Sequence, residues 1–155
     1  MNAVSAHRYL RCAMIAALAV SLQGCAMAEM TLFSAVQGQV LEAGKPLAGA
    51  SVERSWRWTW KKENGADTAT TDAAGSFSLP RVARRSFLGG LVPHEPFVEQ
   101  TILIRHNGRS YKAWMMDKRD YDNDSESGGK PLRLVCRLEA PFARHGQMSG
   151  ICEFV

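Results

Sequence analysis

Two short polar segments carry residue types that could perform acid–base or metal chemistry. In the first, His94 and Glu95 stand between Pro93 and Pro96, so the imidazole and the carboxylate could orient one another as a catalytic pair. However, no nucleophile lies in a recognisable elbow motif, and no H-E-x-x-H zinc motif follows. The favoured interpretation is a structural, hydrogen-bonded histidine. A hydrolase is the least favoured class, and no catalytic residue is predicted.

The second polar segment, residues 120–126, spaces its carboxylates as the start of a calcium loop does. It departs from the EF-hand pattern at two positions. Ser125 occupies the place of the turn glycine, and Pro131 occupies the place of the bidentate glutamate. A solvated acidic loop is therefore favoured, and a calcium-binding module stays an alternative. No metal site and no cofactor are predicted.

Three tryptophans, Trp56, Trp58 and Trp60, alternate with polar residues. On a strand they would share one face at a spacing of roughly 7 Å. The favoured interpretation is that this row fills the core, because aromatic strand faces are usually buried. The alternative is a stacking platform for a sugar ring or for the side chains of a partner. The opposite, basic face could contact an acidic protein or lipid headgroups.

A long connection, residues 81–97, is predicted between two strands, and loops of this length often carry function. It could form a short helix or a lid. Its arginines and apolar side chains are the mixture found at interface hot spots. The alternative is that the apolar residues merely close one end of the fold. The candidate interface residues are Arg84, Arg85, Phe87, Leu88, His94 and Glu95.

The N-terminal residues have the pattern of a secretory signal. Arg8 and Arg11 precede an apolar run over residues 12–20. This run is shorter than the roughly 20 apolar residues that span a bilayer. It is followed by Leu22-Gln23-Gly24-Cys25, which resembles a bacterial lipobox.

The lipobox resemblance implies cleavage before Cys25 and acylation of this cysteine. A rival cut after the A-x-A segment 26–28 would release a soluble periplasmic protein. By analogy with lipoprotein sorting, Ala26 after the anchor cysteine favours the outer membrane. The predicted location is its periplasmic face, with a signal at residues 1–24, a linker at residues 25–32 and one domain at residues 33–155.

Charge and cysteine content agree with export. Loss of Arg8 and Arg11 leaves 17 basic and 15 acidic residues, a net charge of +2, which gives no support for nucleic-acid binding. Cys136 and Cys152 remain as an even pair in an oxidising compartment, so a disulfide is predicted. It would close a loop of about 15 residues, worth roughly 3 kcal/mol. A metal site at these cysteines lacks the C-x-x-C spacing.

Short alternating segments separated by turns predict an all-β sandwich from residue 33 onward. Asp72 to Gly75 predicts a turn, and Asn107-Gly108 predicts a hairpin. The predicted strand segments are residues 36–40, 48–53, 68–71, 76–79, 100–105, 111–116 and 132–138.

Three motifs resemble the carboxypeptidase regulatory-like, transthyretin-like domains. They are Val36-x-Gly38-x-Val40, Gly44-x-Pro46-x-x-Gly49-Ala50-x-Val52 and Thr71-Asp72-x-x-Gly75-x-Phe77-x-Leu79-Pro80. This resemblance implies a seven-stranded Greek-key β-sandwich. Such domains are accessory modules in many proteins, so the resemblance says little about function. The later half resembles a family of small Gram-negative lipoproteins, which implies the same export and no particular reaction.

Together these features predict a non-enzymatic, lipid-anchored periplasmic protein that acts by protein–protein contact. Immunity to a periplasmic toxin and an accessory role in the envelope are both compatible with this class. The alternative is a glycan- or calcium-binding β-sandwich module. The expected partners are the membrane, through Cys25, and a protein; nucleic acid is not expected.

Overall fold

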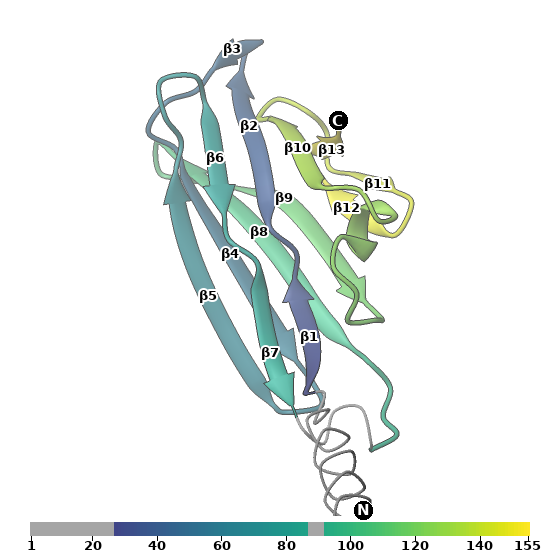
Figure 1. Ribbon diagram of the computed structural model, residues 1–155. Coiled ribbons are helices and arrows are strands. Elements are labelled where there is room, and N and C mark those ends of the chain that lie inside the picture. Colours follow the sequence, from purple (N-terminus) through teal and green to yellow (C-terminus); the bar gives the residue numbers. More distant parts are fainter. Residues whose placement is uncertain (1–26, 87–91) are drawn as a thin grey trace, which may run out of the picture.

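The structure is a computed structural model that describes residues 27–86 and 92–155. Within these residues the fold is all-β, as predicted, with one short 3₁₀ helix, η1 (Ser125–Ser127) (Figure 1). None of the described helices is long and apolar enough to cross a membrane. The strands are β1 (Ala28–Phe33), β2 (Val36–Glu42), β3 (Lys45–Pro46), β4 (Ser51–Trp58), β5 (Glu63–Thr70), β6 (Ser76–Leu79), β7 (Val82–Ser86), β8 (Val98–His106), β9 (Arg109–Lys118), β10 (Leu132–Arg137), β11 (Ala143–His145), β12 (Met148–Gly150) and β13 (Cys152–Phe154).

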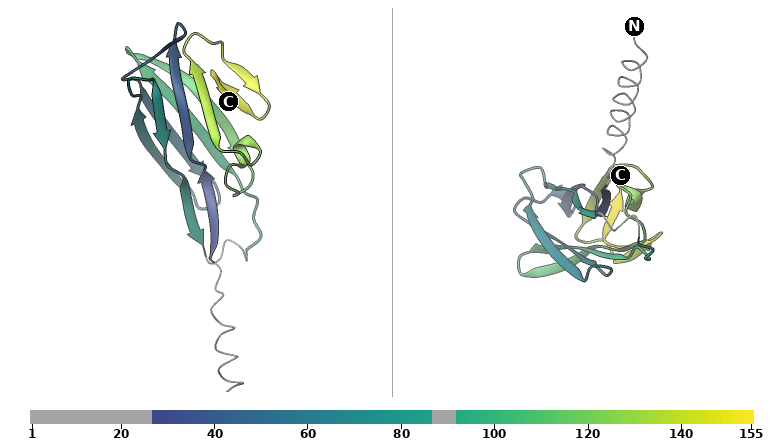
Figure 2. Two further views of the ribbon diagram at one scale, coloured as in Figure 1. Left: turned by 45° about the horizontal axis from the view of Figure 1, so that its top comes forward. Right: turned by 60° about the horizontal axis from the view of Figure 1, so that its bottom comes forward.

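The strands form two layers that face each other (Figures 1 and 2). One layer is a six-stranded sheet in the order β11-β12-β9-β8-β4-β5. The other is a five-stranded sheet in the order β13-β10-β2-β3, in which β6 also pairs with β2. The pair β1–β7 extends this second layer, because β1 runs into β2 and β6 runs into β7 after a break of two residues. β10 lies parallel to β2, whereas the other paired strands are antiparallel.

The core lies between the layers, where the inward residues of each strand meet. β4 alternates strictly, so Val52, Arg54, Trp56 and Trp58 are all buried. The core interpretation of the tryptophan row is therefore confirmed for Trp56 and Trp58, and the stacking alternative is wrong for both. The other large buried side chains include Phe33, Ile102, Ile104, Trp114, Leu132 and Leu134.

A glycine on the edge strand makes room for one of these tryptophans. Gly65 of β5 lies directly opposite Trp56. A Cβ atom at this position would lie 2.1 Å from Cζ2 of the indole, so no larger residue fits without a shift. Trp56 therefore covers a backbone position of β5 that has no side chain of its own.

Both predicted turns are present. The carboxylate of Asp72 accepts hydrogen bonds from the amides of Ala74 (2.9 Å) and Ser76 (2.8 Å), and Gly75 has a φ of 71°. Asn107 and Gly108 both have positive φ, as a two-residue hairpin between β8 and β9 requires.

Two segments expected to be irregular are strands. Residues 28–32, expected to be linker, belong to β1, and residues 82–86 of the expected long loop form β7. The two strands pair with each other, from Ala28 opposite Ser86 to Phe33 opposite Val82. Each strand is stabilised by the other, which alternation within either segment alone could not indicate.

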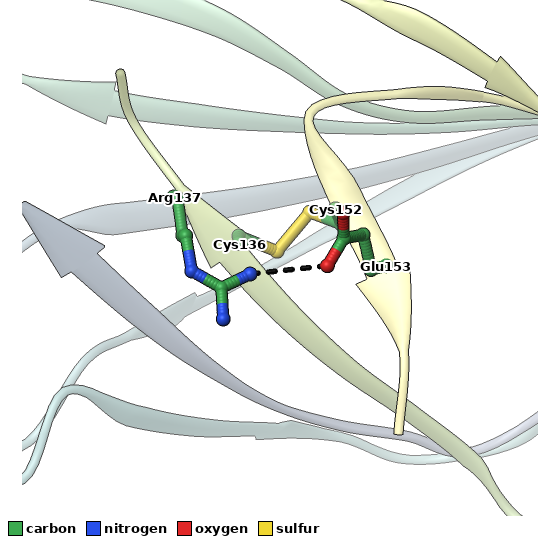
Figure 3. The surroundings of a disulfide bond; sticks show 4 residues. All are labelled: Cys136, Arg137, Cys152 and Glu153. Carbon is green, nitrogen blue, oxygen red and sulfur yellow. Dashed lines mark hydrogen bonds and ion pairs between the residues drawn. A yellow bond between two sulfur atoms is a disulfide. The ribbon is translucent and has the colours of Figure 1, made fainter. Parts of the chain in front are cut away.

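The predicted disulfide between Cys136 and Cys152 is confirmed. The two cysteines lie directly opposite each other on β10 and β13, and both are buried. Beside them Arg137 and Glu153 form an ion pair of 3.1 Å (Figure 3). The last strand is therefore fixed covalently to the five-stranded sheet.

Candidate functional site

Residues from two of the predicted candidate groups meet at one end of the sandwich. β4 ends at Trp58, so Trp60 lies in the turn before β5 and does not continue the strand row. Its ring stacks on His94, with the ring centroids 3.7 Å apart and an interplanar angle of 9°. The ammonium of Lys61 lies 4.1 Å from the centroid of the same indole. The imidazole covers one face of the indole and the ammonium lies close to the ring, so Trp60 is not a free platform for a sugar ring.

His94 is fixed by hydrogen bonds at both ring nitrogens. Nδ1 lies 2.9 Å from the carbonyl oxygen of Val92, which can only accept, so Nδ1 carries the proton. Nε2 lies 2.9 Å from the hydroxyl of Tyr121, and this hydroxyl accepts from Nε1 of Trp58 at 2.9 Å. The Tyr121 hydrogen is then available to Nε2. His94 is thus hydrogen-bonded at both ring nitrogens, and neither bond is to Glu95.

Tyr121 stays protonated in this arrangement. Burial raises the pKa of its hydroxyl above the ordinary value, although the hydrogen bond from Trp58 acts in the opposite direction. The tyrosine can therefore serve as donor to His94 at neutral pH.

The three charged candidate interface residues, Arg84, Arg85 and Glu95, are engaged in partly exposed ion pairs. Such pairs join neighbouring elements and stabilise them only weakly. Arg84 and Arg85 come from β7, and Glu95 comes from the segment before β8. Phe87, Leu88 and Cys25 lie outside the described residues. The pairs are Arg84 with Glu63, Arg85 with Glu29, and Glu95 with Arg119.

We call this region the aromatic end and define it by Trp58, Trp60, Lys61, Lys62, Arg85, His94, Arg119 and Tyr121. The start of β1 and the end of β7 lie here, since Ala28 is opposite Ser86 and Arg84 of β7 pairs with Glu63, the first residue of β5. The turn between β4 and β5 lies here too, since Trp58 is opposite Glu63 (Figure 1). The described chain therefore begins at the aromatic end.

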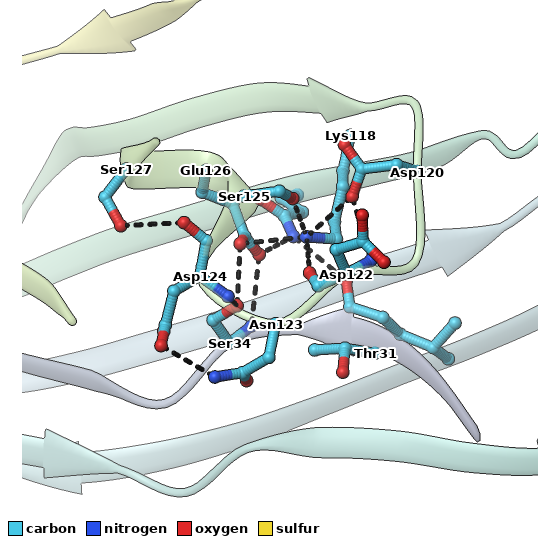
Figure 4. A network of polar contacts seen from close by, with 12 residues as sticks. Thr31, Ser34, Lys118, Asp120, Asp122, Asn123, Asp124, Ser125, Glu126 and Ser127 are labelled. Carbon is cyan, nitrogen blue, oxygen red and sulfur yellow. Dashed lines mark hydrogen bonds and ion pairs between the residues drawn. The ribbon is translucent and has the colours of Figure 1, made fainter. Parts of the chain in front are cut away.

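A buried polar network holds the segment that carries Tyr121 (Figure 4). Lys118, the last residue of β9, has a side chain that is 1% exposed. Its ammonium donates to Oε2 of Glu126 at 2.9 Å, to the carbonyl oxygen of Asp122 at 2.7 Å and to the hydroxyl of Ser125. One ammonium thus ties the 3₁₀ helix and the segment before it to β9.

Glu126 is the buried partner of this lysine. Its Oε1 accepts from the amide nitrogen of Ser34 at 3.1 Å and from Gln100 at 2.8 Å, and Oε2 accepts from the Ser34 hydroxyl at 2.6 Å. Burial alone would raise the pKa of Glu126. The hydrogen bonds from Ser34 and Gln100 and the charge of Lys118 outweigh burial, so the pKa lies below its usual value.

The interpretation of residues 120–126 as a solvated acidic loop is therefore wrong at Glu126. The carboxylate turns inward because Lys118 places a charge inside the sandwich that needs a buried counter-ion. Asp120 also pairs with Lys118, at 3.4 Å. Among the described residues, no three His, Cys, Asp or Glu side chains form a group that could hold a metal ion.

A second buried charge, Arg54, lies on the inner face of β4. Its Nε donates to Asp67 of β5 at 2.9 Å, and its guanidinium carbon lies 5.0 Å from the centroid of the Phe33 ring. Sequence reasoning did not identify Arg54 as buried, although its position between Val52 and Trp56 in the alternating pattern indicated an inward side chain.

A separate hollow among the described surfaces lies on the five-stranded sheet. It has a volume of about 750 Å³, and we call it the sheet groove. Two rows of outward side chains cross the three strands β6, β2 and β10, and the strand register places the members of each row side by side. The rows are Ser78–Gln37–Arg133 and Ser76–Gln39–Val135.

The rim of the sheet groove includes Ala69 and Thr70 of β5 and, on the far side, Val155. Gln39 is held in place by a hydrogen bond from its amide to the carbonyl oxygen of Ala74, at 2.9 Å. Sequence reasoning missed this groove, because its outward Gln and Ser residues resemble an ordinary solvated strand face. Only the parallel pairing of β2 with β10 brings Arg133 beside Gln37.

Comparison with known families adds one finding. The family described as a domain of unknown function, DUF6795, matches residues 36–141, which is more than half of the chain. The chain belongs to this family. The match spans β2 to β10 and includes every residue that defines the aromatic end, the ion pair Lys118–Glu126 and Cys136, whereas Ser34 and Cys152 lie outside it. No curated protein and no solved structure matches the chain significantly.

Proposed function

We propose that this member of the DUF6795 family is a non-enzymatic, lipid-anchored protein on the periplasmic face of the outer membrane. In this proposal it binds an extended segment of a partner protein in the sheet groove. The observation that carries the proposal is the pair of cross-strand rows, which place amide, hydroxyl and guanidinium groups in register over one face.

The chemistry of the groove fits an extended segment that carries a carboxylate. Gln and Ser side chains can donate to and accept from a main chain whose own groups alternate with a period of two. Arg133 forms no ion pair within the described residues and is exposed, so its guanidinium is available to a carboxylate of the partner. Gln39 is already ordered by Ala74, which lowers the entropic cost of binding.

His94, which first suggested catalysis, and the buried pair Lys118–Glu126 are all engaged in contacts within the fold. Both nitrogens of His94 are used in the aromatic end. Lys118 and Glu126 neutralise each other in a buried network. The strongest acid–base candidates therefore maintain the fold.

The same contacts disfavour the two ligand alternatives. A sugar-stacking role would need an open ring face, whereas Trp56 and Trp58 are buried and Trp60 is stacked on His94 with Lys61 close to its ring. A calcium role for residues 120–126 would compete with Lys118 for Asp120 and Glu126. A periplasmic toxin or a component of an envelope assembly fits the proposed partner class.

We further propose that the sandwich is a variant of the transthyretin-like, seven-stranded Greek key. The supporting observation is that a late strand, β10, returns to lie beside the early strand β2. In a Greek key the fourth strand likewise returns to lie beside the first, although that pair is antiparallel and the β2–β10 pair is parallel. The short strands β11, β12 and β13 would then be additions to that framework.

The binding proposal predicts a site-specific cross-link. A photo-reactive amino acid at Ser78 should capture the partner in cells, whereas the same group at Lys112, exposed on the six-stranded sheet, should not. With the captured protein identified and purified, Arg133→Glu should raise the Kd about tenfold or more, because a buried charge-assisted hydrogen bond is lost and a like charge is introduced.

Lys112→Glu makes the same charge reversal away from the groove and serves as the matched control; it should leave the Kd unchanged. Equal capture from Ser78 and Lys112, or an unchanged Kd for Arg133→Glu, would show that the partner does not occupy the sheet groove.

A further inference from the structure

The aromatic end is the part of the fold that lies next to the proposed lipid anchor. Cys25 precedes Ala28, the first residue of β1, by three positions. Even a fully extended chain therefore places the Cα of Cys25 within about 11 Å of the start of β1. A tether this short holds the aromatic end at the bilayer surface.

The composition of this end fits such a surface. Met27 is 51% exposed and Val92 is 44% exposed, although both are apolar. Trp60 lies in the turn between β4 and β5, partly buried. Apolar and aromatic side chains of this kind gather at the headgroup level of membranes, where one part of the side chain meets hydrocarbon and another meets water.

Basic side chains surround the apolar ones. Lys61 and Lys62 are consecutive, exposed and without an ion pair among the described residues. The nearby carboxylates are already committed, because Glu29 pairs with both Arg81 and Arg85, and Glu63 pairs with Arg84. The turn between β4 and β5 therefore carries uncompensated positive charge.

From these observations we infer that the aromatic end is a membrane-contact surface that binds anionic phospholipid headgroups through Lys61 and Lys62, with Trp60 at the headgroup level. The orientation rests on the proposed acylation of Cys25. The lipid affinity itself is assigned to Lys61, Lys62 and Trp60, so it can be measured on a chain without the anchor. Figure 1 shows that β2, β6 and β10 continue the layer beyond β1 and β7. In this orientation the sheet groove, which side chains of β2, β6 and β10 line, therefore lies away from the bilayer.

Vesicle flotation tests the inference on a chain that starts at residue 25 with Cys25→Ser, which retains every described strand and the whole described core. It should bind phosphatidylcholine vesicles that contain about 30 mol% phosphatidylglycerol, and not pure phosphatidylcholine. Binding should fall in about 0.5 M NaCl, because salt screens exposed charges. Lys61→Glu with Lys62→Glu should weaken it about 30-fold or more, since each lysine near an anionic surface contributes about fivefold.

A matched control keeps the test specific. Lys45→Glu with Arg109→Glu makes the same change in net charge at exposed positions of β3 and β9 and should bind like the unchanged chain. Equal vesicle binding by the two double variants would overturn the inference. So would binding to an acidic protein without binding to anionic vesicles, because the surface would then be a protein interface.

A second readout uses the acylated full chain. Brominated lipids should quench its tryptophan fluorescence, and Trp60→Phe should remove most of this quenching, because Trp56, Trp58 and Trp114 are buried. An acylated chain that shows no quenching would refute the membrane contact while leaving the anchor intact. A chain that lacks acylation, but whose Cys25→Ser form binds anionic vesicles, would refute the anchor alone.

Discussion

Replacing Lys118 with methionine should lower the free energy of unfolding by about 3–5 kcal/mol, the usual cost of breaking a buried ion pair. The substitution leaves the carboxylate of Glu126 buried with only neutral donors, from Ser34 and Gln100. Urea or guanidinium denaturation measures the change. Lys130→Met removes an exposed lysine from the same segment and should change stability little.

Two related variants separate the ion pair from simple packing. Glu126→Gln should cost less than Lys118→Met, because Lys118 keeps Asp120 and the carbonyl oxygen of Asp122 as partners. Lys118→Met combined with Glu126→Leu should recover part of the loss, since no buried charge is left. If Lys118→Met unfolded at the same denaturant concentration as the unchanged protein, the network would not hold the fold.

The Lys118–Glu126 pair also sets the direction in which stability changes at acidic pH. The pKa of Glu126 in the folded protein lies below its ordinary value of 4.5. The Glu126 carboxylate therefore makes its full contribution to the free energy of unfolding above pH 4.5. This contribution is lost as the pH falls through the lower pKa of the folded state. We expect Glu126→Gln to show a smaller loss of stability below pH 4.5 than the unchanged protein does.

Replacing Cys136 and Cys152 together with alanine should lower the free energy of unfolding by about 3 kcal/mol, because a cross-link restricts the conformational freedom of the unfolded chain. The cysteines are 16 positions apart, and the bridge holds β13 against β10. Thermal unfolding with and without reductant measures this contribution. Reductant should destabilise the unchanged protein and leave the double variant unaffected.

The disulfide also fixes a segment that lines the sheet groove. The segment that it fixes ends in Phe154, which packs edge-on against Trp114 at 5.5 Å, and in Val155 at the rim of the groove. Reduction should therefore weaken partner binding in addition to stability. If the unfolding curve were the same with and without reductant, the two thiols would be free in the folded protein.

Much of the fold follows from local sequence rules. Strict alternation of apolar and polar residues indicated which face of β4 and β8 is buried, because successive side chains of a strand point to opposite faces of the sheet. The Asp72–Gly75 turn and the Asn107-Gly108 hairpin depend on backbone conformations that few residues adopt, so they too could be predicted. The disulfide could be predicted because only Cys136 and Cys152 follow the predicted signal and Cys25.

The features that the sequence did not reveal depend on partners far apart in the chain. Glu126, the buried partner of Lys118, also receives two hydrogen bonds from Ser34, 92 positions away. Trp60 leaves the tryptophan row because β4 ends at Trp58 and Lys62 adopts a positive φ in the turn. The sheet groove needs the register of three strands, which no local pattern encodes.

One measurement tests the anchored-protein account most directly: the intact mass and N-terminal sequence of the protein purified from bacterial membranes. The account predicts a chain that begins at Cys25 and carries acyl groups, which Cys25→Ala abolishes. Such a tether would place the aromatic end at the bilayer and leave the sheet groove accessible to a partner. A chain that begins at Glu29 without acyl groups would contradict the account.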